Sequence, residues 1–348
     1  MRILLFCLLL FNLCSCKSEE PLKQRNFSEV EIETLLKDSL LNVRALEINE
    51  GRVVAATSNG KILSSILSYM SDFEEGNYWS FTDDSLMPSN FRSIAFQGDN
   101  TFTLSIGSPA KLFQDGRLVY YENNEKAFYD SMDFWNDQEG IAIGDPTDDC
   151  MSIIITRDGG ETWYKLSCDD LPKAKEGEAA FAASDTNISI VGNHTWVATG
   201  GKASRILYSR DKGKTWEVFE TPIIQGKATT GMYSLDFYDE NNGFAIGGDY
   251  TKPNDTLNNK IRTIDGGKTW QVVANGKGPG YRSCVQYIPN SDAKELVAIG
   301  FRGIDYSNDS GDTWKHLSDE GFYTIRFLND SIAYAAGKGR ISKLTFRE

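Results

Sequence analysis

The residues that could carry chemistry in this chain do not form one of the common catalytic motifs. Its two histidines, His194 and His316, belong to neither an HExxH sequence nor a Cys/His cluster. No G-x-S-x-G elbow is present, and the glycine-rich stretch at 276–280 lacks the spacing of a dinucleotide-binding or phosphate-binding loop. We therefore expect no metal site and no bound cofactor, and nicotinamide or flavin chemistry has no sequence fingerprint here.

Charged and phenolic residues instead recur at one position of a repeated strand-like segment. Seven copies begin near residues 43, 91, 129, 178, 232, 281 and 322, and the copy at 178 is the least regular. The second position holds Arg44, Arg92, Asp130, Tyr233, Arg282 and Tyr323, and Glu178 lies near the equivalent place. A companion strand ending in small residues and glycine follows, and the loops after it carry Asp145, Arg205, Asp249 and Arg302. Both sets should converge at one end of a central channel.

This convergence suggests an anionic ligand, such as a carboxylate or an acidic sugar. Arginines and tyrosine hydroxyls gathered in an acidic protein suit such a ligand. The ligand-binding candidates are Arg44, Arg92, Arg205, Tyr233, Arg282, Arg302 and Tyr323. A solvated ring of mutual salt bridges, for example between an arginine and Asp130, is an equally open interpretation.

A carbohydrate-active hydrolase or lyase is the alternative function for the same end of the channel. The side chains that could supply acid, base or nucleophile are Glu178, Asp130, Asp145, Asp249 and Tyr233. Two carboxylates roughly 5 to 9 Å apart and facing an open pocket would favour glycosidase chemistry. Carboxylates each held by an arginine would favour binding, which is the function we expect.

The strands that position these residues are predicted from an eight-residue motif, S/T-x-D-x-G-x-T-W. It occurs four times, at 156–163, 209–216, 263–270 and 307–314. Each copy stands between two β-rich runs and predicts a hairpin turn, in which the aspartate accepts turn amides and the glycine allows positive φ. The motif therefore has a structural role in the turn, and catalysis by its aspartates is the less favoured interpretation.

These repeats predict an all-β chain folded as a seven-bladed β-propeller. The last repeat, 322–346, has sequence for only three strands. Residues 29–35 alternate polar and apolar at strand period, so they can supply the missing outer strand and close the ring.

The N-terminus predicts export. Residues 1–15 read as a signal peptide, and Cys16 follows a sequence that resembles the bacterial lipobox; an ordinary signal peptide cut nearby is the alternative. Residues 16–27 then form a lipidated tether and 28–348 a single propeller. We expect an outer-membrane lipoprotein on the periplasmic or surface side, touching the membrane only through its lipid. The net charge of −13 argues against nucleic acid as a partner.

An oxidising compartment permits a disulfide between Cys150 and Cys168, which flank the first hairpin motif. If Thr156 faces Thr162 across the turn, the two cysteines also face each other, at a Cα separation that a disulfide can span. A bulge in the turn would shift that register and leave two separate small core residues.

The segments GIAIGDP, WVATGGKASRILYS, GFAIGGDY and GYRSCVQYIP, together with the four motifs, resemble the BNR or Asp-box propellers related to photosystem II stability and assembly factors, in particular their non-photosynthetic bacterial members. The resemblance covers about residues 42–346. It implies a propeller that binds an anionic small molecule, an acidic glycan or an extracytoplasmic protein, and we expect a monomer. Relatives carry glycosyl hydrolase and oxidoreductase labels, so those functions stay open, the latter more weakly.

Overall fold

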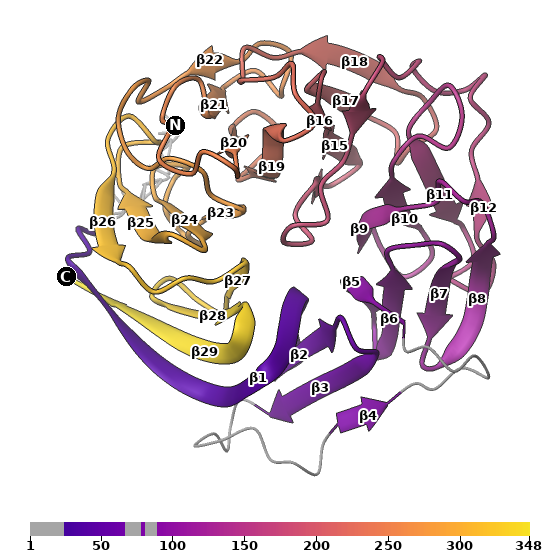
Figure 1. Ribbon diagram of the computed structural model, residues 1–348, viewed down its shortest axis with the longest axis horizontal. Coiled ribbons are helices and arrows are strands. Elements are labelled where there is room, and N and C mark those ends of the chain that lie inside the picture. The colour runs from indigo at the N-terminus through magenta and orange to yellow at the C-terminus, as the bar shows by residue number, and fades with distance from the viewer. Residues whose placement is uncertain (1–23, 67–77, 81–88) are drawn as a thin grey trace, which may run out of the picture.

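The chain forms a ring of β-sheets around a central axis (Figure 1). The computed structural model describes residues 24–66, 78–80 and 89–348. These residues contain strands, turns and loops, and none of them forms a helix long and apolar enough to cross a membrane. The predictions for the signal peptide and for Cys16 lie outside the described residues.

Four of the sheets each contain four antiparallel strands. The first of them is formed by β5 (Phe91–Gln97), β6 (Asn100–Ser105), β7 (Ala110–Gln114) and β8 (Arg117–Glu122). The next is formed by β9 (Tyr129–Phe134), β10 (Gly140–Gly144), β11 (Ser152–Thr156) and β12 (Tyr164–Lys165). The other two contain β14 (Ile188–Val191), β15 (His194–Ala198), β17 (Arg205–Ser209) and β18 (Glu217–Glu220), and β23 (Cys284–Tyr287), β24 (Leu296–Gly300), β25 (Gly303–Ser307) and β26 (Lys315–Ser318).

A fifth sheet has six strands because two short strands extend it. Its main part is formed by β19 (Thr230–Phe237), β20 (Gly243–Asp249), β21 (Lys260–Thr263) and β22 (Gln271–Val272). The extension consists of β13 (Glu178–Ala179) and β16 (Gly200–Gly201), which belong to the neighbouring repeat; β16 pairs with β19, and β13 pairs with β16. Adjacent repeats are therefore joined by hydrogen bonds at this point of the ring.

The sixth sheet has seven strands and contains both ends of the ring. It runs in the order β27 (Thr324–Phe327), β28 (Ile332–Ala336), β29 (Lys338–Arg347), β1 (Glu29–Asn49), β2 (Arg52–Thr57), β3 (Lys61–Ile66) and β4 (Tyr78–Ser80). The described strands thus form six hydrogen-bonded sheets rather than seven, because the long β1 joins the first and last repeats.

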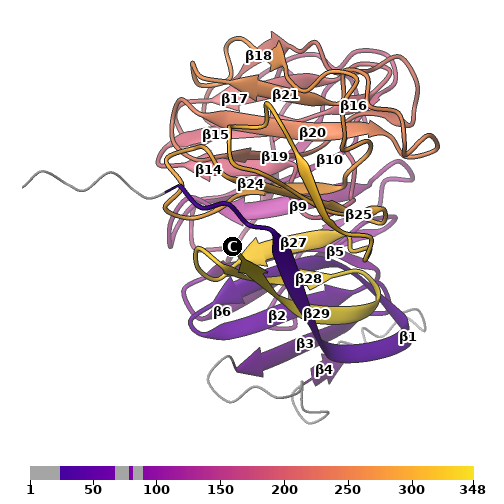
Figure 2. The ribbon, with the colours of Figure 1, turned by 90° about the vertical axis from the view of Figure 1, so that its left-hand side faces the viewer.

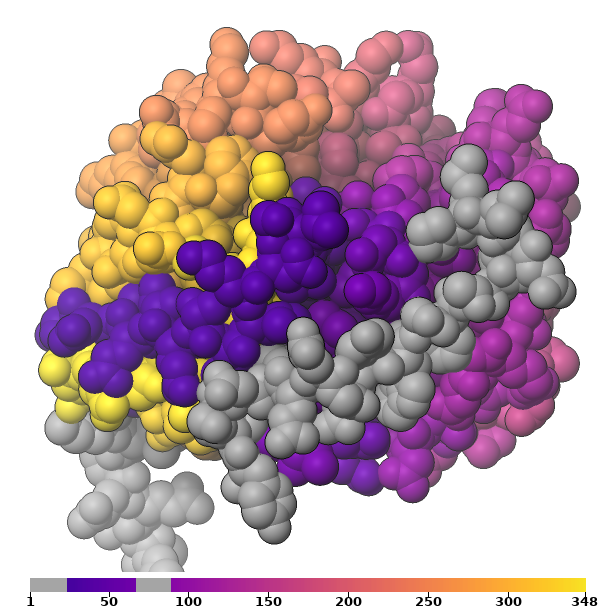
Figure 3. Space-filling view, turned by 60° about the horizontal axis from the view of Figure 1, so that its bottom comes forward, coloured from indigo at the N-terminus to yellow at the C-terminus, as the bar shows by residue number. Residues whose placement is uncertain are grey.

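The predicted closure by residues 29–35 is confirmed. The first part of β1 pairs antiparallel with β29, from Glu29 opposite Arg347 to Thr34 opposite Ser342. Its last part pairs with β2, from Ala45 opposite Ala56 to Asn49 opposite Arg52. Figures 2 and 3 show β1 lying along the C-terminal strand and continuing into the first repeat. The last repeat consequently has no open outer edge.

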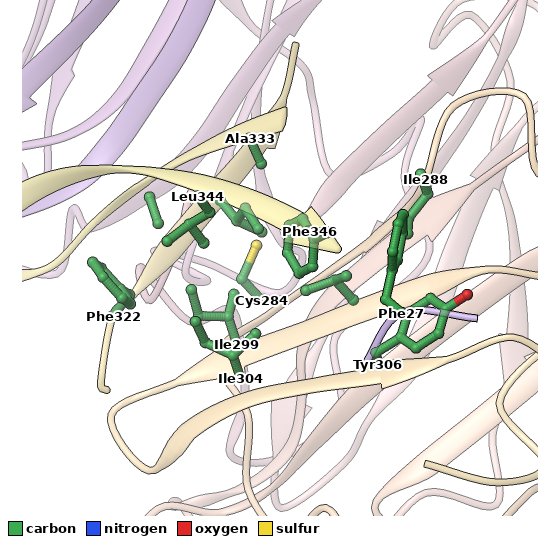
Figure 4. Close-up of a cluster of buried hydrophobic side chains, with 13 residues drawn as sticks. Phe27, Cys284, Ile288, Ile299, Ile304, Tyr306, Phe322, Ala333, Leu344 and Phe346 are labelled. Carbon is green, nitrogen blue, oxygen red and sulfur yellow. The ribbon is translucent and has the colours of Figure 1, made fainter. Parts of the chain in front are cut away.

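An N-terminal aromatic side chain strengthens this closure. Phe27 is 2% exposed, and its ring centre lies 5.1 Å from that of Tyr306 and 5.6 Å from that of Phe346. Figure 4 shows these rings together with Ile288 in one buried cluster. The segment before β1 is therefore packed onto the two C-terminal repeats.

The four S/T-x-D-x-G-x-T-W segments form the same turn. In the first, Asp158 accepts hydrogen bonds from the Thr162 amide (2.9 Å) and hydroxyl (2.6 Å), and Thr156 accepts the Gly160 amide (2.9 Å). The other three segments repeat these contacts. Each turn also bonds to the loop between the first and second strands of its repeat, so the turns lie on the face where the innermost strands end.

Cys150 and Cys168 are joined by a disulfide, with Cα atoms 5.4 Å apart. The register that led us to this pair is, however, wrong by one residue. Ile154 pairs with Lys165 and Ile155 with Tyr164, so strict continuation would place Cys168 opposite Met151. The bond still forms because the pairing stops before Cys168: β12 ends at Lys165, and the last hydrogen bond between the two strands joins the Leu166 amide to the Ile153 carbonyl.

Candidate ligand-binding site

The predicted strand-start residues reach the channel through a repeated irregularity of the inner strands. The pairing of these strands skips one residue near their beginning, and the skipped residues are Arg44, Arg92, Asp130 and Tyr233. A β-bulge of this kind bends the strand and redirects one side chain. In these four strands the recurrence seen in the sequence is thus a recurrence of bulges, which carry polar side chains at the same end of the strand.

Three of these side chains, Arg44, Arg92 and Tyr233, line a cavity of about 460 Å³ at that end of the channel, which we call the arginine mouth. The polar residues that line it are Arg44, Arg92, Asp145, Tyr233, Tyr250, Tyr281, Ser283 and Tyr323. The mouth lies at the start of the inner strands and the hairpin motifs lie where those strands end. The two features therefore occupy opposite faces of the ring.

Arg44 is held in the mouth by an aromatic ring and a main-chain carbonyl. Its guanidinium carbon lies 3.9 Å from the centre of the Tyr323 ring, and its Nη1 donates to the Ala183 carbonyl at 2.9 Å. Its Nε is buried and has no hydrogen-bond partner. Burial lowers the pKa of Arg44. A positive charge with an unsatisfied donor is thus partly withdrawn from water, which costs free energy unless an anion is bound.

Arg92 is in a similar situation. Its Nε donates to Asn90 Oδ1 at 3.0 Å and its Nη1 to the Ala182 carbonyl at 3.3 Å. Burial, followed by the nearby charge of Arg44, lowers the pKa of Arg92 to about 10. Neither arginine has a carboxylate of the described residues within salt-bridge distance. The ring of mutual salt bridges considered above does not form around these two side chains.

Aromatic rings form the remaining wall of the mouth. Tyr233 stacks on Phe181 with ring centres 4.0 Å apart, and it meets Tyr281 edge to face at 4.8 Å. Tyr281 in turn lies 5.4 Å from Phe301. Phe301 and Tyr250 are large apolar side chains that stay exposed at the rim. The mouth therefore offers both cationic groups and an apolar surface to a ligand.

Two carboxyl groups lie beside the arginines. Asp145 accepts the Ala180 amide at 2.7 Å, and burial raises its pKa to about 6. Asp130 is fully buried, neither of its carboxyl oxygens has a hydrogen-bond partner, and burial followed by Asp145 raises its pKa well above the usual range. Asp130 is therefore kept neutral, whereas Asp145 is still mostly ionised at pH 7, so two arginines face one charged carboxylate in the mouth.

Glu178, Arg205 and Arg282 are not available to a ligand, which corrects our expectation for them. Glu178 and Arg205 form a buried bidentate pair, with Nε–Oε1 at 3.0 Å and Nη2–Oε2 at 2.5 Å. Arg282 pairs in the same way with Asp305, at 2.7 and 2.5 Å. In each pair the guanidinium charge is neutralised by a carboxylate of its own repeat.

The remaining candidates divide between the mouth and its surroundings. Tyr233 donates its hydroxyl to the Thr229 carbonyl, and Asp249 accepts the amide and hydroxyl of Thr251, which lowers the pKa of Asp249. Arg302 is exposed and contacts Asn254 at 3.3 Å, outside the mouth. Of the four candidate carboxylates, Asp145 alone lines the cavity. The mouth thus lacks the pair of facing carboxylates that a glycosidase needs.

A chain segment that the sequence did not predict crosses the channel next to the arginine mouth. Residues 180–187, which we call the channel segment, accept hydrogen bonds from Arg44, Arg92, Thr324 and Arg326. The same segment donates to the Ser283 carbonyl. Figure 1 shows a loop in the colour of this part of the chain at the centre of the ring. The segment therefore closes the channel between two cavities, and the described parts of the other repeats contain no counterpart that could have revealed it.

No family model and no curated protein matches the chain. Among solved structures it is similar to "YCF48 bound to D1 peptide", with a TM-score of 0.61 at 12% sequence identity over 93% of this chain and 97% of that chain. It is also similar to YCF48 from Cyanidioschyzon merolae (TM-score 0.59, 13% identity, 91% and 99% covered) and to the WD40 repeats of RRP9 (0.64, 9%, 92% and 98%). At these identities the similarity concerns the fold, and the chain is a β-propeller.

Proposed function

We propose that this chain is an exported, lipid-anchored binding protein that holds an anionic group of an extracytoplasmic partner in the arginine mouth. The observation that carries the proposal is that Arg44 and Arg92 lie side by side, partly buried, without a carboxylate partner among the described residues. Two desolvated guanidinium groups create a strong preference for a carboxylate, which they can bind through charge-assisted hydrogen bonds.

A peptide or protein carboxylate suits this mouth best. The aromatic wall of Phe181, Tyr233, Tyr281 and Phe301 can bury an apolar side chain next to the charged group. One of the similar structures, by its description, is bound to a peptide. The proposal counts the ring as seven blades, with β1 shared between the first and the last, and treats the protein as a monomer whose partner binds at the blade-start face.

The experiment compares two pools of random octapeptides, one with free C-terminal carboxylates and one with amidated C-termini. We expect selective enrichment from the first pool, and we expect Arg92→Gln and Arg44→Gln each to weaken binding of an enriched peptide by about tenfold or more, since a hydrogen bond to a charged group contributes about 1.5–3 kcal/mol. Arg302→Gln is the matched control and should change affinity less than about twofold. Equal enrichment of both pools, or equal losses in all three variants, would contradict the proposal.

The anchoring part of the proposal has its own support and its own test. A disulfide is typical of exported proteins. Arg25, near the C-terminal end of the proposed tether, is fixed by a 2.6 Å ion pair with the buried Glu295, so the chain is attached to the fold before the tether ends. Palmitate labelling of cells should mark the wild-type protein and not Cys16→Ser. Labelling of both would refute lipidation at Cys16.

A further inference from the structure

A second cavity, of about 350 Å³, lies at the other end of the channel, where the inner strands finish. The channel segment separates it from the arginine mouth. Its charged lining is formed by Glu47, Asp133, Asp185, Asp236 and Arg326, and we call it the acidic end. Four of these residues stand three positions after a strand-start residue, so the same repeat that builds the mouth also builds this cavity.

Arg326, the cation in this lining, is already fully engaged. Its Nε pairs with Glu47, its Nη1 donates to Thr324 Oγ1 (3.0 Å) and the Ile325 carbonyl (2.9 Å), and its Nη2 donates to the Asp185 carbonyl (3.0 Å). The Arg326 guanidinium therefore binds one carboxylate and three neutral acceptors. The three aspartate carboxylates form no ion pair with Arg326, although its nearby charge partly opposes the rise in their pKa values that burial causes.

Each aspartate is oriented by a main-chain amide. Asp133 accepts the Phe134 amide at 2.7 Å, Asp185 the Ile94 amide at 2.9 Å, and Asp236 the Tyr287 amide at 2.7 Å. One oxygen of each carboxyl group is thus fixed. Asp185 is 6% exposed, and its second oxygen, Oδ1, is buried without any hydrogen-bond partner. A buried acceptor left unsatisfied costs about 1–3 kcal/mol, which a bound donor would recover.

We propose that the acidic end binds a cationic group on an alkyl chain, a primary ammonium or a guanidinium, between Asp133, Asp185 and Asp236. Such a group presents several donors to carboxylates that surround it. A single metal ion does not fit, because the described residues contain no group of three or more His, Cys, Asp or Glu side chains that could hold one. The apolar lining, from Ile48, Ile94, Phe96 and Leu235, suits the alkyl chain.

The charge state of the cavity makes the site sensitive to pH. Burial raises the pKa of Asp133 and of Asp236 to about 7, and it raises those of Asp185 and Glu47 as well; Arg326 is the opposing charge. A bound cation favours the ionised carboxylates, so binding near pH 7 should release protons. Affinity should accordingly rise between pH 6 and pH 8.

The test is calorimetric titration of the full chain with agmatine, which carries both cationic groups, at pH 6 and pH 8. We expect binding that is several-fold tighter at pH 8, with proton release at pH 7 measured from the difference between two buffers of unlike ionisation enthalpy. The double variant Asp133→Asn, Asp236→Asn should lose at least tenfold in affinity. Asp145→Asn removes a carboxylate from the arginine mouth and is the control, with a change below about twofold.

Two further comparisons make the result specific. Acetyl-Gly-Arg-Gly-amide in place of agmatine distinguishes a protein side chain from a free small amine, according to which of the two binds more tightly. Arg92→Gln should leave agmatine binding unchanged, so failure at the arginine mouth and failure at the acidic end can be told apart. Absence of binding at pH 8, absence of proton release, or an equal loss in Asp145→Asn would overturn the proposal.

Discussion

The guanidinium of Arg44 lies over the ring of Tyr323, 3.9 Å from its centre, and these two residues come from the first and last repeats of the chain. They occupy equivalent positions, each second in its strand-start segment. Closure of the ring by β1 is therefore what brings them together. The arginine mouth is complete only when the ends of the chain are joined.

This relationship predicts that the Tyr323 ring orients Arg44 for its ligand. Tyr323→Leu should weaken binding of a carboxylate peptide by about fivefold, because a desolvated cation–π contact contributes about 0.5–2 kcal/mol. Tyr323→Phe keeps the ring and should stay within about twofold of the wild type. Fluorescence anisotropy of a labelled peptide measures both. Equal losses would show that the phenol hydroxyl, and not the ring face, is what matters.

Arg282 and Arg92 should respond differently to substitution although they hold equivalent sequence positions. Arg282→Met removes the bidentate arginine partner of the buried Asp305 carboxylate and leaves it only His316 Nδ1 at 3.0 Å, which should lower the free energy of unfolding by about 3–5 kcal/mol. Arg92→Met has no ion pair to break and should change it by less than about 1 kcal/mol. Urea denaturation followed by tryptophan fluorescence gives both values. Comparable losses would mean that Arg92 is also part of a structural ion pair.

The difference between these two arginines also shows which parts of the site could be predicted from the sequence. The repeat predicted the β-propeller fold, the closing strand and the end of the channel at which Arg44, Arg92 and Tyr323 meet. It could not separate Arg92 from Arg282, because the partner of Arg282 lies 23 residues further along the chain, on a strand whose register is not visible in the sequence. The channel segment was missed because, among the residues that the structure describes, it has no copy in another repeat.

The acidic end, by contrast, was within reach of the sequence. Glu47, Asp133, Asp236 and Arg326 recur three positions after the strand-start residues. Without the bulge, two residues three apart on a strand would point to opposite faces. Because the bulge absorbs one residue, both positions face the channel. Recognising the bulge from the sequence would have revealed the second cavity.

The disulfide gives a third prediction. The double variant Cys150→Ser, Cys168→Ser should lose about 3 kcal/mol of stability, as expected for a bond that closes a loop of this length. Dithiothreitol should lower the melting temperature of the wild type to that of the variant and leave the variant unchanged. The remaining described thiol, Cys284, is buried and serves as an internal control for reagent access. A wild type insensitive to the reductant, with both thiols reactive when unfolded, would contradict the bond.

The last prediction concerns the pH dependence of stability. Folding lowers the pKa values of one group of aspartates and raises those of another. The turn aspartates, such as Asp158 and Asp265, accept several hydrogen bonds that lower their pKa values. They bind fewer protons in the folded than in the unfolded state, so their contribution is complete above about pH 4 and disappears as the pH falls below it.

Asp133 and Asp236 behave in the reverse sense. Their folded pKa values of about 7 lie above the unfolded value of about 3.9, so between these limits the folded protein binds more protons and stability falls as the pH rises. Asp133→Asn and Asp236→Asn remove that proton linkage. Each variant should therefore gain stability relative to the wild type at pH 8 compared with pH 5, as measured by urea denaturation at the two values. A wild-type profile that the substitutions leave parallel from pH 5 to pH 8 would show that these carboxylates ionise normally, and that the acidic end is open to water rather than buried.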